Sequence, residues 1–389
     1  MKIGIVIQRY GLDVVGGAEY LCRQLAEKLV KYYQVEVITT CAKDYITWVN
    51  EYSAGRSKIN GVSIIRFPSV RRRNIDEFNK LSEWIYRNEH SIQDELMWLE
   101  EQGPVCPDLV KYIKEESQNY GLMIFFTYLY YPTYYGMKEC CTKMILVPTA
   151  HDEPAIHLNI YKEIMRLANA IVFNTQAEKN LVQNLFDIDS KIQLTVGIGI
   201  KVPLYVKKGA FKRKNGLERD YIVFGGRIDA GKGCKEMIEY YQEYKSRTDD
   251  YPLLVMFGRL DVPLPADPDI MYLGYITEQE KIEVYAGARV VVVPSAYESL
   301  SLVLLEGFSY GVPALVNASS AVLVDHCVRS NAGLFYSNRE EYIEMLYLLL
   351  HNNELRNALG RNAIRYIKNN YNWNKVINEY TNLIDQLTK

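Results

Sequence analysis

The chain has 389 residues, of which 48% are hydrophobic and 24% charged, and its formal net charge is -2. This composition is that of a globular protein, the length suits two domains of roughly 150 to 200 residues each, and the charge gives no electrostatic basis for a nucleic-acid partner. The seven cysteines form no C-x-x-C motif, so we expect reduced thiols and no zinc site. No secretory signal is evident and no apolar run approaches the roughly 18 to 20 residues that cross a bilayer, which predicts a cytoplasmic protein.

The first half of the chain alternates predicted strands and helices. Strands are expected at 2–8, 35–39, 62–67, 121–128, 144–147 and 170–174, and helices near 18–29 and 176–185, with a largely helical stretch from 70 to 118. Alternation of β and α units predicts a doubly wound first domain. Gly16 and Gly17 lie between the first strand and the first helix, where the backbone can approach a phosphate or sugar closely. A glycine turn is often only a turn, so this signal is weak alone.

Two polar clusters follow in the first half. Arg71, Arg72 and Arg73 precede a helical segment that carries Trp84, which suits either an anionic membrane surface or a solvated helix face. The sequence His151-Asp-Glu comes directly after the expected strand 144–147. Polar residues at the carboxyl end of a strand are often site residues, although a lone histidine is as often structural.

The strand and helix pattern lapses between residues 197 and 214, a lysine-rich segment that we interpret as the interdomain linker. The predicted domains are residues 1–200, residues 201–370 and a terminal helix in residues 371–389. In the second domain, strands are expected at 221–224, 253–257, 270–273, 289–293 and 314–316, and helices at 234–245, 278–285, 302–310 and 339–352. This alternation predicts a second doubly wound sheet.

The stretch from residue 289 to 317 reads as a buried strand, a polar loop, a helix and a further strand. Ser301 stands at the expected N-cap of the helix. Glu298 in the loop and Glu306 in the helix are eight positions apart. Because ligands of doubly wound sheets bind outside the carboxyl ends of the strands, both carboxylates are candidate site residues.

A glycine-rich loop follows the first strand of the second domain and carries Arg227 and Lys232. Residues 226–232 satisfy G-x-x-x-x-G-K, but a P-loop needs Ser or Thr next, and this chain has Gly233. Arg227 and Lys232 can instead neutralise a diphosphate that the loop backbone approaches. The alternative is two surface cations on a loop that caps a helix.

In combination, the Gly-Gly turn, G-G-R-x-x-x-x-K-G and P-S-x-x-E-S-L-S-L-V-L-L-E-G resemble the retaining glycosyltransferases of family 4, over essentially the whole chain. The resemblance implies the GT-B fold: two Rossmann-like domains facing each other across a cleft, with a C-terminal helix that crosses back to the first. It implies a nucleoside diphosphate sugar as donor, with UDP or GDP expected, a glycan or lipid-linked acceptor, and no required metal or cofactor.

The resemblance also assigns roles to residues. It implies that Arg227 and Lys232 neutralise the leaving diphosphate and that Glu298 faces the donor sugar. The other implied contacts are Glu306 with the ribose hydroxyls, the amides of Ser301 and Leu302 and the backbone of Gly17 with the diphosphate, His151 beside the sugar, and Gly258, Tyr275 and Ile276 with the base. This chain departs from the family at Ser299-Leu-Ser301, where Gly-Phe-Gly is common, so a Cβ stands at a backbone expected to touch phosphate.

The expected function is sugar transfer in the assembly of bacterial surface polysaccharide or glycoconjugate, in the cytoplasm or peripherally at the inner face of the plasma membrane. Two alternatives share the fold: a non-hydrolysing nucleotide-sugar epimerase, and a non-catalytic glycan-binding or partner subunit. Conversion of the nucleotide sugar without acceptor would indicate the epimerase. The four charged residues of the expected donor site argue against the non-catalytic alternative.

Overall fold

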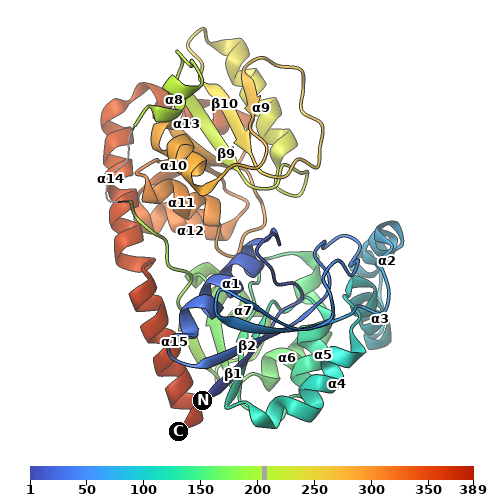
Figure 1. Cartoon of the computed structure of the whole chain (residues 1–389). Coiled ribbons are helices and arrows are strands. Elements are labelled where there is room, and N and C mark those ends of the chain that lie inside the picture. Colours follow the sequence, from blue (N-terminus) through green and yellow to red (C-terminus); the bar gives the residue numbers. More distant parts are fainter. Residues whose placement is uncertain (204–207) are drawn as a thin grey trace. The chain divides into compact units, whose positions relative to one another are not determined.

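The computed structural model describes residues 1–203 and 208–389, and the chain forms two compact units. Unit 1 comprises Met1–Ile198 and Val376–Lys389, and unit 2 comprises Gly199–Lys375. Each unit is built around one sheet with helices on both faces (Figure 1). Both sheets are of the doubly wound type that the sequence predicts.

Unit 1 has an eight-stranded sheet in the order β3-β4-β2-β1-β5-β6-β7-β8, parallel except for the antiparallel pair β3 and β4. The strands are β1 (Lys2–Val6), β2 (Gln34–Thr40), β3 (Gly55–Ile59), β4 (Val62–Phe67), β5 (Leu122–Phe126), β6 (Met144–Val147), β7 (Ala170–Phe173) and β8 (Ile192–Thr195). The helices are α1 (Gly17–Leu29), α2 (Ile75–Arg87), α3 (Ile92–Gln102), α4 (Pro107–Glu116), α5 (Tyr131–Glu139), α6 (Ile160–Leu167) and α7 (Gln176–Leu185), with short 3-10 turns at Ser117–Asn119 and Pro154–His157.

Unit 2 has a six-stranded, all-parallel sheet in the order β11-β10-β9-β12-β13-β14. Its strands are β9 (Tyr221–Gly225), β10 (Leu253–Phe257), β11 (Ile270–Tyr272), β12 (Val290–Val293), β13 (Ala314–Asn317) and β14 (Gly333–Tyr336). Its helices are α8 (Ala210–Lys214), α9 (Cys234–Arg247), α10 (Glu278–Gly287), α11 (Leu302–Ser309), α12 (Ala321–Ser330), α13 (Arg339–His351) and α14 (Asn353–Asn370). The order 3-2-1-4-5-6 reverses between β9 and β12, and this reversal defines the switch point at which such sheets bind ligands.

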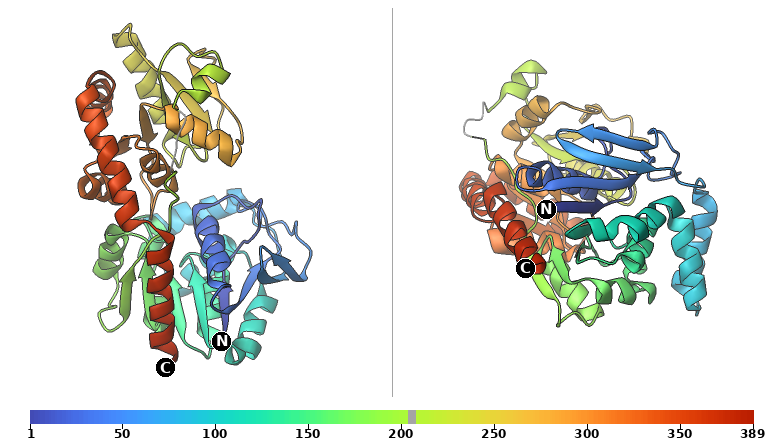
Figure 2. Two further views of the ribbon diagram at one scale, coloured as in Figure 1. Left: turned by 60° about the vertical axis from the view of Figure 1, so that its left-hand side comes forward. Right: turned by 60° about the horizontal axis from the view of Figure 1, so that its bottom comes forward.

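The last helix, α15 (Trp373–Thr388), begins in unit 2 and continues into unit 1 (Figure 2). Within unit 1, its Tyr380 is buried near Cys22 of α1 and Glu178 of α7, and its Asp385 accepts a hydrogen bond of 3.2 Å from Tyr33. The apolar side of α15 therefore becomes part of the core of unit 1, as the helical spacing of its apolar residues indicates.

The predicted strands and helices are confirmed, but seven elements were not predicted, namely β3, β8, α5, α6, α12, β14 and α14, and neither was helix α8 within the predicted linker. Strands β3 and β8 are exposed or half-buried edge strands, so they lack the apolar pattern that marks a buried strand. Helices α12 and α14 were missed although both have N-cap residues, since the Ser320 side chain accepts a hydrogen bond from the Leu323 amide and the Asn352 side chain accepts one from the Leu355 amide. The predicted linker, 197–214, includes helix α8, and its residues 204–207 lie outside the described residues.

Candidate active site

Two loops meet at the switch point of unit 2. The β9–α9 loop comprises residues 226–233, and the β12–α11 loop comprises residues 294–301. Gly233 lies in the left-handed region at φ 70°, and a Cβ there would come within 2.5 Å of the carbonyl oxygen of Pro294. A Cβ at Gly258, after β10, would lie 2.0 Å from the oxygen of Gly226. The glycines therefore allow three loops to pack backbone against backbone at this edge.

An ion pair joins the two loops. The Lys232 ammonium lies 2.8 Å from Oε1 of Glu298, and both side chains are partly exposed, at 26% and 14%. Asp229 organises the β9–α9 loop, because its Oδ1 accepts a 2.7 Å hydrogen bond from the Lys232 amide and its Oδ2 lies 3.4 Å from Nη1 of Arg227. The structure thus brings Arg227, Lys232 and Glu298 together. Asp229 was not identified from the sequence.

Glu306 lies one turn into α11 and is held by a lysine that sequence reasoning missed. Lys281 of α10 donates a 2.7 Å hydrogen bond to Oε1 of Glu306. Desolvation raises the pKa of the Glu306 carboxyl, and Lys281 opposes that rise. Burial alone would lower the pKa of Lys281, but Glu306 outweighs it and the pKa is raised. Because α10 and α11 are far apart in sequence, no local motif links the two residues.

The residues expected to hold the base lie at the same edge of unit 2. Gly258 donates a 2.8 Å hydrogen bond to Gly274, and its carbonyl accepts one of 2.8 Å from the Tyr272 hydroxyl. Tyr275 is 68% exposed, and Ile276 beside it is half-buried and precedes Thr277, the N-cap of α10. Their contact with a base stays a prediction of the family resemblance.

Ser301 departs from the expected N-cap. It occupies the N-cap position of α11, but its φ and ψ are 62° and 80°, and its side chain makes no capping hydrogen bond. Its Oγ is buried without a hydrogen-bond partner among the described residues. A capping serine needs extended backbone geometry, whereas the left-handed conformation seen here is one that glycine adopts without cost. The prediction of a serine cap was therefore wrong, and Leu302 begins the helix with no side-chain cap.

The remaining predicted site residues belong to unit 1. Nε2 of His151 lies 3.3 Å from Oε2 of Glu153, whose Oε1 accepts a 2.7 Å hydrogen bond from the Tyr128 hydroxyl. Burial would raise the pKa of Glu153, but the hydrogen bonds from His151 and Tyr128 lower it below its usual range. Gly17 begins α1, and a Cβ there would meet nothing within 4 Å, so its backbone is open.

The arginine cluster at 71–73 is not a uniform basic patch. Arg73 is buried and donates hydrogen bonds to the carbonyls of Tyr45 and Ile46 and to Gln102, while Arg71 pairs with Glu101 at 2.8 Å. Desolvation lowers the pKa of Arg73. The interpretation of three arginines facing a membrane is wrong for Arg73, which is part of the fold.

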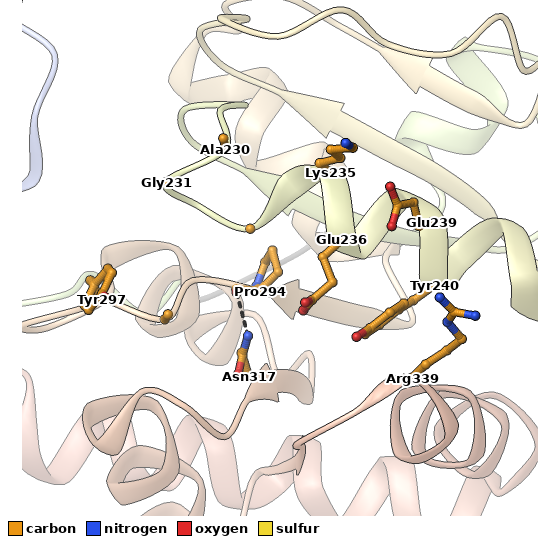
Figure 3. Close-up of a pocket in the computed structure, with 12 residues that line it drawn as sticks. Ala230, Gly231, Lys235, Glu236, Glu239, Tyr240, Pro294, Tyr297, Asn317 and Arg339 are labelled. Atoms are coloured by element: carbon orange, nitrogen blue, oxygen red, sulfur yellow. Dashed lines mark hydrogen bonds between the residues drawn. The ribbon is translucent and has the colours of Figure 1, made fainter. Parts of the chain in front are cut away.

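A pocket of about 530 Å³ lies beside the β9–α9 loop, on the side of α9 and α13 (Figure 3). Asn317, at the end of β13, donates a 3.1 Å hydrogen bond to the carbonyl of Pro294 at its floor. The side chains around it have both signs of charge, including Glu236, Glu239 and Arg339. The pocket borders the two loops but contains neither Lys232 nor Glu298 among its lining residues.

Across residues 1–203 and 208–389, no cluster of three or more His, Cys, Asp or Glu side chains is arranged to hold a metal ion. The helices within these same ranges are all too short or too polar to span a bilayer.

Residues 207–366 match the family model of group 1 glycosyl transferases. A D-inositol 3-phosphate glycosyltransferase of Corynebacterium efficiens is 24% identical over 58% of this chain and 58% of its own length. An uncharacterized glycosyltransferase of Methanocaldococcus jannaschii is 22% identical over 98% of this chain and 97% of its own length.

Solved structures show the same fold across the whole chain. Sucrose-phosphate synthase from Thermosynechococcus elongatus superposes with a TM-score of 0.71 at 16% identity, covering 99% of this chain and 98% of its own. Anabaena HepE in complex with UDP-glucose superposes with a TM-score of 0.71 at 12% identity, covering 100% of both chains. The protein therefore has the GT-B fold and carries, over residues 207–366, the domain of a group 1 glycosyltransferase enzyme.

Proposed function

We propose that the protein is a retaining glycosyltransferase of family 4 that transfers a sugar from a nucleoside diphosphate sugar to a glycan or lipid-linked acceptor. The observation that carries this proposal is the ion pair of Lys232 and Glu298, which spans the two loops at the switch point of unit 2. A cation held there can bind the diphosphate of the donor, and a carboxylate beside it can bind the sugar.

The charge in the β9–α9 loop suits a diphosphate leaving group. Breaking the bond between sugar and diphosphate builds negative charge on the phosphate oxygens, and preorganised donors are typically worth about 3 to 4 kcal/mol each in the transition state. Arg227 and Lys232 would supply two fixed cations, and the amides of Ser301 and Leu302 at the N-terminus of α11 would add N–H donors. This arrangement requires no divalent ion.

The carboxylates would then bind hydroxyl groups. Glu298 would face the hydroxyls of the donor sugar and Glu306 those of the ribose. A carboxylate has about four lone-pair sites, so Glu306 can accept from ribose while it also accepts from Lys281. The backbone of Gly258, Tyr275 and Ile276 would hold the base, for which UDP or GDP is expected. From unit 1, Gly17 would contact the diphosphate and His151 the sugar.

The proposed biological setting is assembly of a bacterial surface polysaccharide or glycoconjugate. HepE and a trehalose-6-phosphate protein of Escherichia coli were solved with UDP-glucose and UDP-2-fluoroglucose, respectively, which makes UDP the first donor nucleotide to test. Retention of configuration and use of the departing phosphate as base follow from the family resemblance.

Binding of a nucleoside diphosphate tests the proposal directly. A ligand at a hundred times its Kd should add about 2.7 kcal/mol to the stability of the folded protein. We expect a rise in melting temperature with at least one of UDP, GDP, ADP and dTDP, and no rise with the corresponding nucleoside at equal concentration. If none of the four has an effect, the donor site is wrong. A panel of nucleotide sugars without acceptor then distinguishes donor hydrolysis from conversion to another nucleotide sugar, which would indicate an epimerase.

A further inference from the structure

A fully buried histidine on α12 forms a hydrogen bond with the β12–α11 loop. His326 on α12 is 0% exposed, its Nε2 lies 2.9 Å from the carbonyl oxygen of Leu300, and its Nδ1 lies 3.0 Å from the hydroxyl of Tyr366 on α14. Helices α11, α12 and α14 lie together in unit 2 (Figure 1). No residue of α12 was singled out from the sequence.

The partners of His326 define its tautomer. A carbonyl oxygen can only accept, so Nε2 carries the proton and donates it to Leu300. Nδ1 is then the acceptor in the neutral ring, and the Tyr366 hydroxyl donates to it. Burial lowers the pKa of His326 to about 4, so the imidazole is neutral at physiological pH. The Tyr366 oxygen also lies 3.5 Å from the hydroxyl of Tyr371, which can donate to it.

The hydrogen bond from His326 to the Leu300 carbonyl also sets the direction of the Ser301 N–H. The peptide unit is planar and trans, so the Leu300 carbonyl and the Ser301 N–H lie in one plane and point in opposite directions. With the carbonyl directed at His326, the Ser301 N–H is directed away from α12. Fixing one oxygen therefore fixes the direction of the amide that the proposed function places against the diphosphate.

Ser301 makes such a constraint necessary. Its φ of 62° costs a residue with a Cβ of order 1 kcal/mol or more, and conformations of this kind persist only where the surroundings impose them. The β12–α11 loop lacks the glycine that would adopt this φ freely. The hydrogen bond from His326 reaches the peptide unit immediately before Ser301 and supplies that constraint.

We propose that His326 is a positioning residue for the donor site: through the Leu300 carbonyl it orients the Leu300–Ser301 peptide so that the Ser301 amide faces the donor diphosphate. Tyr366 assists by holding the imidazole in the required tautomer. This inference rests on the proposed function for the identity of the ligand, but the orientation of the peptide does not depend on it.

The experiment compares His326→Leu with His326→Gln, whose side-chain amide can donate to Leu300 and accept from Tyr366. Cys327→Ala is the matched control, because Cys327 is the next residue on α12 and is also buried, but its thiol lies beside Gly333 of β14. The probe is the nucleoside diphosphate that raises the melting temperature of the wild type most. We expect His326→Leu to weaken the affinity for this diphosphate by about tenfold, as for loss of one hydrogen-bond donor to a charged group. Affinity for the nucleoside should stay unchanged, Gln should restore most of the loss, and Cys327→Ala should lower stability without changing either affinity.

A double-mutant cycle separates positioning from general destabilisation. Glycine adopts the φ of Ser301 without strain, so His326→Leu should cost several-fold less diphosphate affinity in a Ser301→Gly background than in the wild type. Independent effects of the two substitutions, or a diphosphate affinity in His326→Leu equal to that of Cys327→Ala, would overturn the proposal.

Hydrogen exchange of the unliganded protein provides the readout that needs no ligand. The Leu305 amide, which donates a 3.2 Å hydrogen bond to the Ser301 carbonyl, should exchange faster in His326→Leu than in wild type and near the wild-type rate in His326→Gln. Unchanged protection in His326→Leu contradicts the positioning role even if diphosphate binds. If no diphosphate binds the wild type, the proposed function fails, and the exchange experiment still decides whether His326 orders this peptide.

Discussion

The switch points of the two sheets carry the same kinds of side chain but bury them differently. In unit 1, Gln8 after β1 donates to Glu19 at 2.8 Å and accepts from Thr127 after β5 at 3.1 Å, and Arg9 pairs with Glu19 at 2.5 Å. Gln8, Arg9 and Glu19 are at most 6% exposed. In unit 2, the corresponding link between strand ends is the partly exposed pair Lys232 and Glu298.

This difference indicates that the switch points of the two sheets have different roles. Polar groups that satisfy one another in the interior are not available to a ligand, so the cluster of Gln8, Arg9 and Glu19 serves the fold, whereas Gly17 nearby is exposed. The Lys232–Glu298 pair keeps contact with solvent, at 26% and 14% exposed, so its charges can exchange partners with an incoming ligand. Unit 2 is therefore the unit in which charge is available for chemistry.

The largest expected effect comes from breaking the buried pair of unit 1. Glu19→Gln leaves Arg9 charged and uncompensated, and removing one partner of a buried ion pair typically costs about 3 to 5 kcal/mol. We expect urea denaturation to show that loss, whereas diphosphate affinity under native conditions stays at the wild-type value. The control is Glu27→Gln on the same helix, which removes a partly exposed pair with Arg23 and should cost less than about 1 kcal/mol. A comparable cost at both positions would remove the contrast between buried and exposed charge.

Breaking the ion pair of unit 2 should impair catalysis and leave stability nearly unchanged. Lys232→Ala removes one cation from the leaving diphosphate, which should lower turnover by about a hundredfold or more while the melting temperature changes little. Lys245→Ala is the control, since Lys245 is a lysine of the same unit that pairs with Asp267 and Asp269 away from the switch point. It should lose stability and retain turnover. Turnover of Lys232→Ala at the wild-type level would exclude the lysine from the mechanism.

The sequence was most informative where a local pattern determines structure. Apolar runs predicted the buried strands β6 and β10 at the residues observed, and glycine with cations predicted the loop that carries Arg227 and Lys232. Contacts between distant segments were not readable: Lys281 is 25 positions from Glu306, and His326 is 26 positions from Leu300. Both contacts depend on which helices lie side by side in the folded unit. Edge strands such as β3 were missed because exposure removes the apolar signal.

Ser301 was identified from the sequence but assigned the wrong local structure, because serine before a helix ordinarily indicates a cap. Its left-handed backbone and unpartnered Oγ suggest two separate costs, and two substitutions separate them. Ser301→Gly removes both costs and should raise the free energy of unfolding by about 1 kcal/mol, since glycine tolerates this φ. Ser301→Ala removes the hydroxyl alone and keeps the strain.

The matched control for the backbone term is Asn331→Gly. Asn331 has a φ of 46° at the end of α12, and asparagine tolerates the left-handed region, so this change should alter stability by a few tenths of a kcal/mol at most. Denaturation curves of the three variants give the two costs separately. The diphosphate affinity of the variants then tests the role of the hydroxyl. If the Ser301 Oγ pairs with the ligand, both Ser301 variants should bind diphosphate more weakly than the wild type. Unchanged affinity in Ser301→Ala would leave the backbone amide, held by His326, as the group that this residue presents to the donor.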